Sequence, residues 1–357
     1  MKIYLKSIVF LVLLVSCSEK ETNSTENEVI SINHLKSVVL KQSKPLFGKF
    51  YERFKITGDG EYWIFVDRMR DKIFVFDKEG QYINTISESG RGPRGIVSID
   101  GFDVNENNEV FIYDASQRML KIYTLNDELI SSNNFLEKVN FGTTPLEMLW
   151  HEGKVLTSII ENEFMFEPQN SKILALIKTD GEIDTVFGRF DPFAEHDNTY
   201  SFFNNIIIDD SSNVVFTSLS SSPFIQVFDL NRFSKESYIG AKNSTFKVPE
   251  KEISANLSID EVNRRSVNTS HAANLFLTDD YIVQHIQTLT EEWFLTTDYS
   301  SKANSLIFYD RITGDIVQEL PVNHSLGSVR DNKLYFIQDF NPDNYTIGIY
   351  EIVTDQK

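Results

Sequence analysis

A short pattern that recurs six times along the chain constrains its fold more than any other feature. An apolar strand, a polar turn and a second strand follow one another, and the turns are rich in Asp, Asn, Gly and Lys. These residues favour the tight turns of β-hairpins. The six copies are IFVFDKEGQYINTI (73–86), LKIYTLNDELISS (120–132), ILALIKTDGEIDTVF (173–187), IQVFDLNRFSKESYI (225–239), LIFYDRITGDIVQEL (306–320) and IGIYEIVTDQK (347–357).

A second hairpin precedes each copy, as in FKITGDGEYWIFVD (54–67) and GFDVNENNEVFIYD (101–114), so the repeating unit has four strands, A to D. The last copy leaves little room for its strand D, which HLKSVVLKQ (34–42) can supply. Four-stranded units arranged around an axis form a β-propeller, and closing the ring removes its open edge. We therefore predict an all-β fold, a six-bladed β-propeller with four-stranded antiparallel blades, closed by an N-terminal strand.

The N-terminus, MKIYLKSIVFLVLLVSC, combines two lysines with an apolar run from Ile8 to Val15. The run is too short to span a bilayer and is typical of a signal peptide. Leu14 to Cys17 resembles a bacterial lipobox, in which the cysteine is lipidated, and Cys17 is the only cysteine. We expect a signal peptide over 1–16, a flexible tether over 17–33 and the propeller over 34–357. An ordinary cleaved signal with a chance cysteine is the alternative.

The first two blades carry the clearest resemblance to a known family. In blade one, a strand ends in Asp67, an Arg-rich turn follows, and the next strand reads IFVFD. Blade two repeats this pattern with Asp114 and Arg118, but Thr124 replaces the expected Asp. This resembles NHL-type repeats, and together with the lipobox the chain resembles the six-bladed β-propeller lipoproteins of Bacteroidota. The resemblance implies an outer-membrane lipoprotein, periplasmic or surface-exposed.

Charge narrows the choice of partners. The formal net charge is −18, which argues against a broad nucleic-acid surface, because phosphate backbones require clusters of Lys and Arg. It also argues against charge-driven binding to an anionic membrane. We therefore expect membrane contact through the lipid anchor only, no nucleic-acid partner, and a monomer.

The stretch Gly-Arg-Gly-Pro-Arg-Gly (90–95) has the G-x-G-x-x-G spacing of a dinucleotide-binding loop. That loop requires a helix directly after it, whereas IVSIDGFDV (96–104) alternates like a strand. Pro93 also removes one of the amides that would bind a phosphate. The stretch is better interpreted as the connector from strand D of blade one to strand A of blade two.

The long segments of the chain all fall in B–C loops or D–A connectors, which share one face of a propeller. We call it the loop-bearing face, and its long segments are 162–171, 188–201, 240–270 and 289–302. Insertions on one face usually mark a binding side. Apolar spacing at Ile253, Leu257 and Val262 predicts a short helix there. The candidate ligand-binding residues are Arg68, Arg70, Arg91, Arg94, Arg118 and Trp293.

Guanidinium groups suit carboxylates, sulfates or phosphates, but pairing with acids such as Asp67 and Asp114 would explain the arginines equally. The expected function is binding or scaffolding of a glycan, peptide or partner protein, without catalysis or a cofactor. The alternative is a metal-dependent propeller hydrolase or lyase, similar to lactonases, with an ion such as calcium in the central channel. Its candidate ligands are Asp103, Glu147, Asn205 and Asn274.

Overall fold

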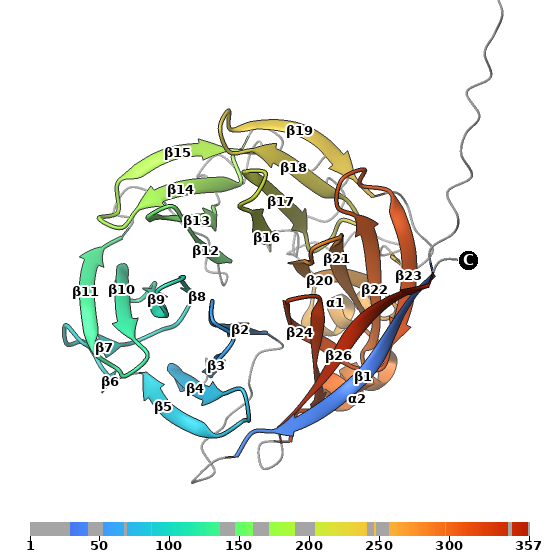
Figure 1. The fold of residues 1–357 in the computed structure, drawn as a ribbon, viewed down its shortest axis with the longest axis horizontal. Coiled ribbons are helices and arrows are strands. Elements are labelled where there is room, and N and C mark those ends of the chain that lie inside the picture. The colour runs from blue at the N-terminus through green and yellow to red at the C-terminus, as the bar shows by residue number, and fades with distance from the viewer. Residues whose placement is uncertain are drawn as a thin grey trace, which may run out of the picture.

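The computed structural model is a ring of six four-stranded antiparallel sheets around a central axis (Figure 1). This confirms the predicted all-β, six-bladed propeller. The structure describes residues 29–41, 53–67, 70–86, 88–135, 147–159, 171–189, 204–240, 246–247, 257–296, 298–341 and 345–355.

Each blade runs from an innermost strand A to an outermost strand D. Blade one consists of β2 (Phe54–Ile56), β3 (Tyr62–Asp67), β4 (Lys72–Asp77) and β5 (Tyr82–Ile86); blade two of β8 (Gly101–Val104), β9 (Glu109–Asp114), β10 (Met119–Thr124) and β11 (Leu129–Asn134). Blade three consists of β12 (Met148–His151), β13 (Lys154–Ser158), β14 (Leu174–Lys178) and β15 (Ile183–Phe187); blade four of β16 (Asn204–Asp209), β17 (Val214–Leu219), β18 (Ile225–Asp229) and β19 (Ser234–Ile239). Blade five consists of β20 (Ser270–Leu277), β21 (Tyr281–Thr288), β22 (Ala303–Asp310) and β23 (Ile316–Val322); blade six of β24 (Ser325–Arg330), β25 (Lys333–Asp339), β26 (Thr346–Asp355) and β1 (Val29–Val39).

The N-terminal strand β1 closes the ring, as predicted, by pairing with β26 along blade six. It begins at Val29, so residues 29–33 of the expected tether are strand. The reason is the alternation of Ile30 and Ile32, which lets Ile30 pack, 1% exposed, in the core between blades five and six. Gln318 of blade five also accepts a hydrogen bond from Ile30 N (2.6 Å) and donates one to Ile30 O (2.8 Å).

The apolar core of the described residues divides into six clusters, one at each boundary between neighbouring blades. Strand alternation explains this, because successive side chains point to opposite faces of a sheet and so contact the two adjacent blades. The boundary of blades six and one is aromatic, with Phe54 stacked on Phe65 at 4.5 Å between ring centroids. A side chain at Gly327 would collide with Phe54, so glycine is required there.

Polar side chains at the ends of the C strands shape the C–D turns. Asp77 accepts hydrogen bonds from the backbone of Glu79 and Gln81, and Asp310 does the same for Ile312 and Thr313. In blade two Thr124 accepts from the backbone of Asn126 and Glu128. Thr124 therefore accepts the backbone hydrogen bonds of this turn, as aspartate does at the same position of the repeat.

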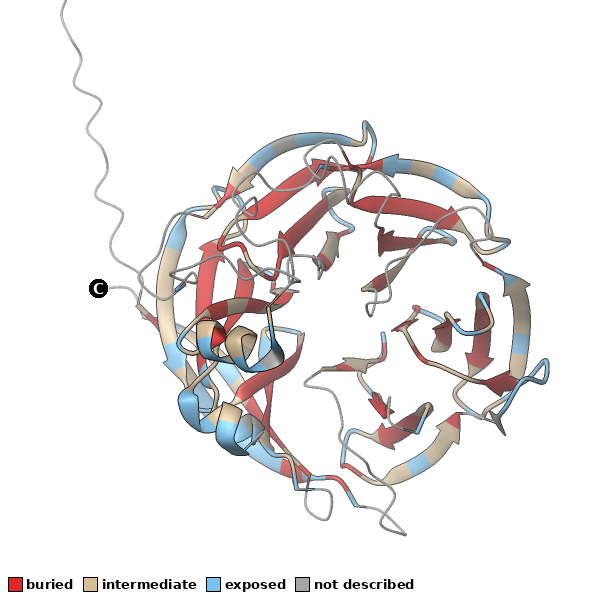
Figure 2. Ribbon diagram, turned by 180° about the vertical axis from the view of Figure 1, so that it is seen from behind, coloured by how far each residue is buried: buried red, intermediate tan, exposed pale blue. Residues whose placement is uncertain are grey.

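Two helices, α1 (Ile259–Ser266) and α2 (Glu291–Thr296), lie on the same side of the ring, the loop-bearing face seen in Figure 2. Ser258 caps α1 by accepting from Glu261 N, and Thr290 caps α2 by accepting from Trp293 N. The predicted helix in 240–270 is thus present over 259–266; Ile253 lies outside the described residues. No helix in the described part of the chain is long and apolar enough to cross a membrane.

Candidate functional site: the loop-bearing face and the axis

The predicted arginine group does not gather into one site. Arg70 lies 3.9 Å from the buried carboxylate of Asp67, and the turn residue Arg118 has a positive φ of 56°. Arg68 lies outside the described residues. In α1, Arg264 and Arg265 both pair with Glu261. Pairing with neighbouring acids therefore accounts for Arg70 and for the two arginines of α1.

Acids are dense where Arg70 and Arg118 lie. Burial raises the pKa of Asp71, a backbone hydrogen bond from Ile99 opposes the rise, and the nearby carboxylates of Asp114, Asp100 and Asp67 add to it. Positive charge on the arginines offsets the repulsion among these carboxylates, and the carboxylates in turn weaken the attraction of the arginines for an anionic ligand.

The GRGPRG stretch is a connector, as predicted, but its arginines do not both point to the loop-bearing face. Its ends pair as two short parallel strands, β6 (Glu88–Ser89) and β7 (Gly95–Ile96), and the loop between them folds back along β10. Tyr123 donates to the Arg94 carbonyl (2.6 Å), and Arg94 donates to the Asp127 carbonyl (2.7 Å) in a C–D turn. C–D turns belong to the opposite face. The expected position of Arg94 is therefore wrong.

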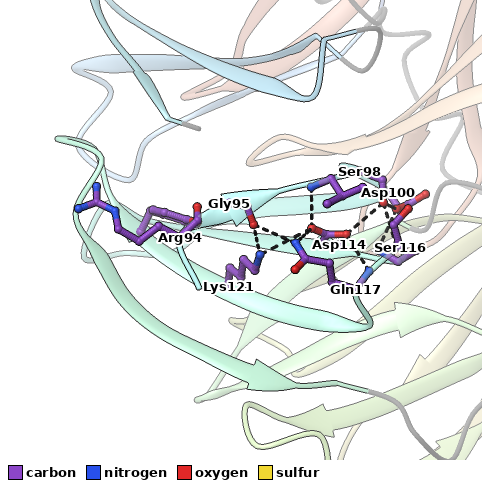
Figure 3. Close-up of polar contacts among 11 residues, drawn as sticks. Arg94, Gly95, Ser98, Asp100, Asp114, Ser116, Gln117 and Lys121 are labelled. Carbon is purple, nitrogen blue, oxygen red and sulfur yellow. Dashed lines mark hydrogen bonds and ion pairs between the residues drawn. The ribbon is translucent and has the colours of Figure 1, made fainter. Parts of the chain in front are cut away.

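Asp114 holds this connector against blade two (Figure 3). Its carboxylate, closed to solvent, accepts hydrogen bonds from Val97 N (2.8 Å), Gln117 N (3.0 Å) and Gln117 Nε2 (2.7 Å). Lys121 lies 3.7 Å away and also donates to the Gly95 carbonyl. Arg94 points away from this network in Figure 3. The strand-end aspartate noted in the sequence is thus a structural anchor.

The axis of the propeller is crossed by an arginine that the sequence did not single out. Arg53 directly precedes β2 in blade one, yet its guanidinium donates to Glu147, to Asn205 Oδ1 and to the carbonyl of Ala273. These acceptors belong to the innermost segments of blades three, four and five. One side chain therefore links four of the six blades.

Further polar contacts join neighbouring innermost strands around the axis. Lys55 lies 3.1 Å from Asp103, which also accepts from Trp150 N (2.7 Å). Two amides continue the series: Asn205 donates to the Ala272 carbonyl (2.8 Å), and Asn274 donates to the Leu326 carbonyl (3.2 Å). All four candidate metal ligands thus lie around the axis. The oxygens of Asp103, Glu147 and Asn205 face basic side chains, and Asn274 is held through its amide nitrogen.

A divalent ion does not fit this arrangement. Calcium takes six to eight oxygen ligands, whereas Glu147 and Asn205 already accept hydrogen bonds from Arg53, and Asp103 faces Lys55. Among the described residues, no group of three or more His, Cys, Asp or Glu side chains could hold a metal. The side chains of Arg53 and Lys55 therefore supply the positive charge that faces these oxygens.

A buried polar cluster, which we call the blade-five seam, lies between blades five and six and extends to the loop-bearing face. Asn274, His285, Gln287 and Asn304 are at most 6% exposed. His285 Nε2 lies 2.9 Å from Asn304 Oδ1, and Gln287 Nε2 donates to the same oxygen (3.2 Å). Since Asn304 Oδ1 can only accept, His285 carries its proton on Nε2.

The outer end of the seam contains Trp293, the one aromatic candidate. Lys302 Nζ lies 5.5 Å from the Trp293 ring centroid and donates to Gln287 Oε1 (3.1 Å), where His271 Nε2 also lies at 3.1 Å. Two buried polar atoms of this region, Trp293 Nε1 and Asn274 Oδ1, have no hydrogen-bond partner in the described structure. A buried polar atom without a partner calls for an explanation, such as a bound water or ligand.

Sequence reasoning missed Arg53 and most of the seam. Arg53 contacts residues between 94 and 220 positions away, so no local motif signals it. The seam had a weak signal. His285, Gln287 and Asn304 are polar residues at positions where the alternation of buried strands expects apolar ones.

Comparisons with known proteins agree with this architecture. A family model described as a 6-bladed beta-propeller (DUF5128) matches residues 51–216. A solved member of the DUF4221 family from Bacteroides vulgatus has a TM-score of 0.72 at 13% identity, covering 92% of this chain and 100% of that chain. A Bacteroides fragilis protein, provisionally described as exported, has a TM-score of 0.55 at 14% identity, covering 94% and 97%. No curated protein matches the sequence. The chain is thus similar to six-bladed propellers, and the structural likeness concerns the fold alone.

Proposed function

We propose that this protein is an envelope lipoprotein, built from NHL-like repeats, that binds a ligand through the loop-bearing face of blade five. The observation that carries the proposal is the outer end of the blade-five seam. There the Lys302 ammonium and the His271 imidazole meet at the Gln287 amide, and the Trp293 ring lies 5.5 Å from Lys302 Nζ. Trp293 Nε1 is buried and lacks a partner in the described structure. Small convergent polar groups beside an aromatic ring are typical of ligand sites.

The chemistry of these groups favours a glycan over a peptide or a partner protein. Amide and imidazole groups both donate and accept hydrogen bonds, which suits hydroxyl groups, and indole supplies an apolar face with one donor. Of the arginines that would suit an anionic ligand, Arg70 and Arg94 lie beside Asp67 and Asp127. Binding without catalysis remains the proposal, since the oxygens at the axis are engaged by basic side chains.

The binding proposal is tested by incubating the soluble propeller, from residue 18 onward, with an array of neutral and acidic oligosaccharides. We expect neutral glycans to be retained, and Trp293→Ala to abolish retention while the thermal midpoint changes little. Retention of acidic glycans alone, or equal retention by the variant, would argue against this site.

The lipid anchor rests on Cys17 and the apolar run before it. In cells, the wild-type chain should partition with the outer membrane, and Cys17→Ser should release it into a soluble fraction without altering the fold. If Cys17→Ser partitions as the wild type does, the lipid anchor is rejected. The binding proposal is tested separately by the oligosaccharide array.

A further inference from the structure

We infer that the axis of this propeller holds a cation site that the chain fills with its own Arg53 side chain. The inference is independent of the proposed glycan site, which lies at the boundary of blades five and six. Its basis is the convergence of three oxygen acceptors from three blades on one guanidinium.

The acceptors match a guanidinium in charge and in number. Glu147 supplies one negative charge, and Asn205 and the Ala273 carbonyl supply neutral oxygens, so the set balances one positive charge. The planar guanidinium has five N–H donors and can serve several acceptors in its plane. Calcium takes six to eight oxygen ligands, so these three residues are too few to coordinate it.

The site is shielded enough for the pairing to affect stability. The side chains of Arg53 and Glu147 are 31% and 15% exposed. Asn205 is nearly closed to solvent, and its own amide is committed to the Ala272 carbonyl. Removing the guanidinium therefore leaves a carboxylate and two further oxygens without their donor.

This assignment gives Arg53 a structural role, since it joins blades one, three, four and five at the centre of the ring. It also excludes the use of these oxygens for metal-assisted chemistry while Arg53 is in place. When the Arg53 side chain is removed, the vacated site should bind a small planar guanidinium ion, such as methylguanidinium, rather than a divalent metal.

Chemical rescue tests the assignment directly. Arg53→Ala should lower the thermal midpoint by at least about 3 °C, and millimolar methylguanidinium should restore part of the loss, whereas calcium should not. Wild type should respond to neither. The matched control is Arg330→Ala, because Arg330 also joins two blades by donating to the Thr57 and Gly58 carbonyls. Its carboxylate partner, Asp331, is the next residue in the chain and is exposed, so the deletion leaves no buried carboxylate at the blade boundary. The midpoint of Arg330→Ala should not recover.

Four results would overturn the inference: an unchanged midpoint for Arg53→Ala, no recovery with methylguanidinium, equal recovery of Arg330→Ala, or stabilisation of the wild type by calcium. If Arg53→Ala does not fold, a double-mutant cycle of Arg53→Lys and Glu147→Gln decides. The two midpoint losses should then be clearly less than additive, and additive losses would reject the pairing.

Discussion

Lys121 Nζ lies 3.7 Å from the carboxylate of Asp114, and both side chains are closed to solvent. Burial lowers the pKa of Lys121, while the Asp114 carboxylate offsets part of that shift. The pair stands where the connector between blades one and two meets blade two. Its two members are not equivalent, because Asp114 has several other donors, from Val97, Ser98 and Gln117.

This asymmetry predicts unequal losses of stability. Asp114→Ala removes the acceptor of the connector and leaves the buried Lys121 ammonium without its counter-ion, which should cost about 3–5 kcal/mol. Lys121→Met should cost less, about 1–2 kcal/mol, because Asp114 keeps its other donors. Urea denaturation of the two variants measures the difference. Equal losses, or a larger loss for Lys121→Met, would contradict the role of Asp114 as the anchor of the connector.

Two glycines of the GRGPRG connector should respond differently to the same substitution. A Cβ on Gly95 would lie 2.2 Å from the Gly90 carbonyl oxygen, a backbone atom that closes the loop. A Cβ on Gly92 meets nothing within 4 Å. Gly95→Ala should therefore lower the free energy of unfolding by about 1–3 kcal/mol, and Gly92→Ala should change it by less than about 0.5 kcal/mol. Thermal denaturation compares them, and similar effects would contradict the loop geometry.

Acid should weaken the contact between blades four and five. Burial alone would raise the pKa of Asp209, but hydrogen bonds from Arg311, Ser211 and Ser212 outweigh it and hold the pKa well below its usual range. The stability from this depressed pKa is present above the unfolded value of about 3.9 and is lost as the pH falls below it.

Arg311 is the main hydrogen-bond donor in that balance, with Nη2 lying 2.6 Å from Asp209. Arg311→Gln should therefore be less stable than wild type at pH 7, and its unfolding free energy should fall less steeply between pH 4 and 2. Denaturation series at several pH values provide the comparison. Parallel curves for both proteins would show that other carboxylates cause the acid sensitivity.

Substitutions in the closing strand β1 should lower the stability of the protein only where the side chain is buried. Ile30 is 1% exposed, whereas Leu35 on the same strand is 45% exposed. Ile30→Ala should cost about 2–5 kcal/mol, and Leu35→Ala should be nearly neutral. Limited proteolysis should then cut Ile30→Ala within β1 before the rest of the ring. If the two variants are equally stable, β1 does not seal the propeller.

The fold could be predicted because each blade carries its own local pattern. Strand alternation, turn residues and six copies are all visible within short windows, and the N-terminal strand was found by counting. The position of Arg94 could not be predicted in this way. Its loop folds back along β10, and that path depends on long-range contacts with Tyr123 and Asp127.

The axis shows the same limit more clearly. The sequence predicts Glu147, Asn205 and Asp103 as oxygen ligands on innermost strands; in the structure Asn205 and Asp103 lie in such strands and Glu147 directly precedes one. Their cationic partners, Arg53 and Lys55, come from blade one, and only the closed ring brings Arg53 to the far side of the axis. The choice between a metal and a guanidinium therefore required the tertiary structure.

We propose that ligand binding takes place on the loop-bearing face of blade five. The most direct test is calorimetric titration of the neutral oligosaccharide best retained on the array into three proteins: wild type, Trp293→Ala and Ile312→Ala. Ile312 is 94% exposed in a C–D turn on the opposite face. Trp293→Ala should bind at least about tenfold more weakly, a loss of about 1.4 kcal/mol of binding free energy, and Ile312→Ala should bind as the wild type does. Unchanged binding for Trp293→Ala, or a loss for Ile312→Ala alone, would contradict this proposal.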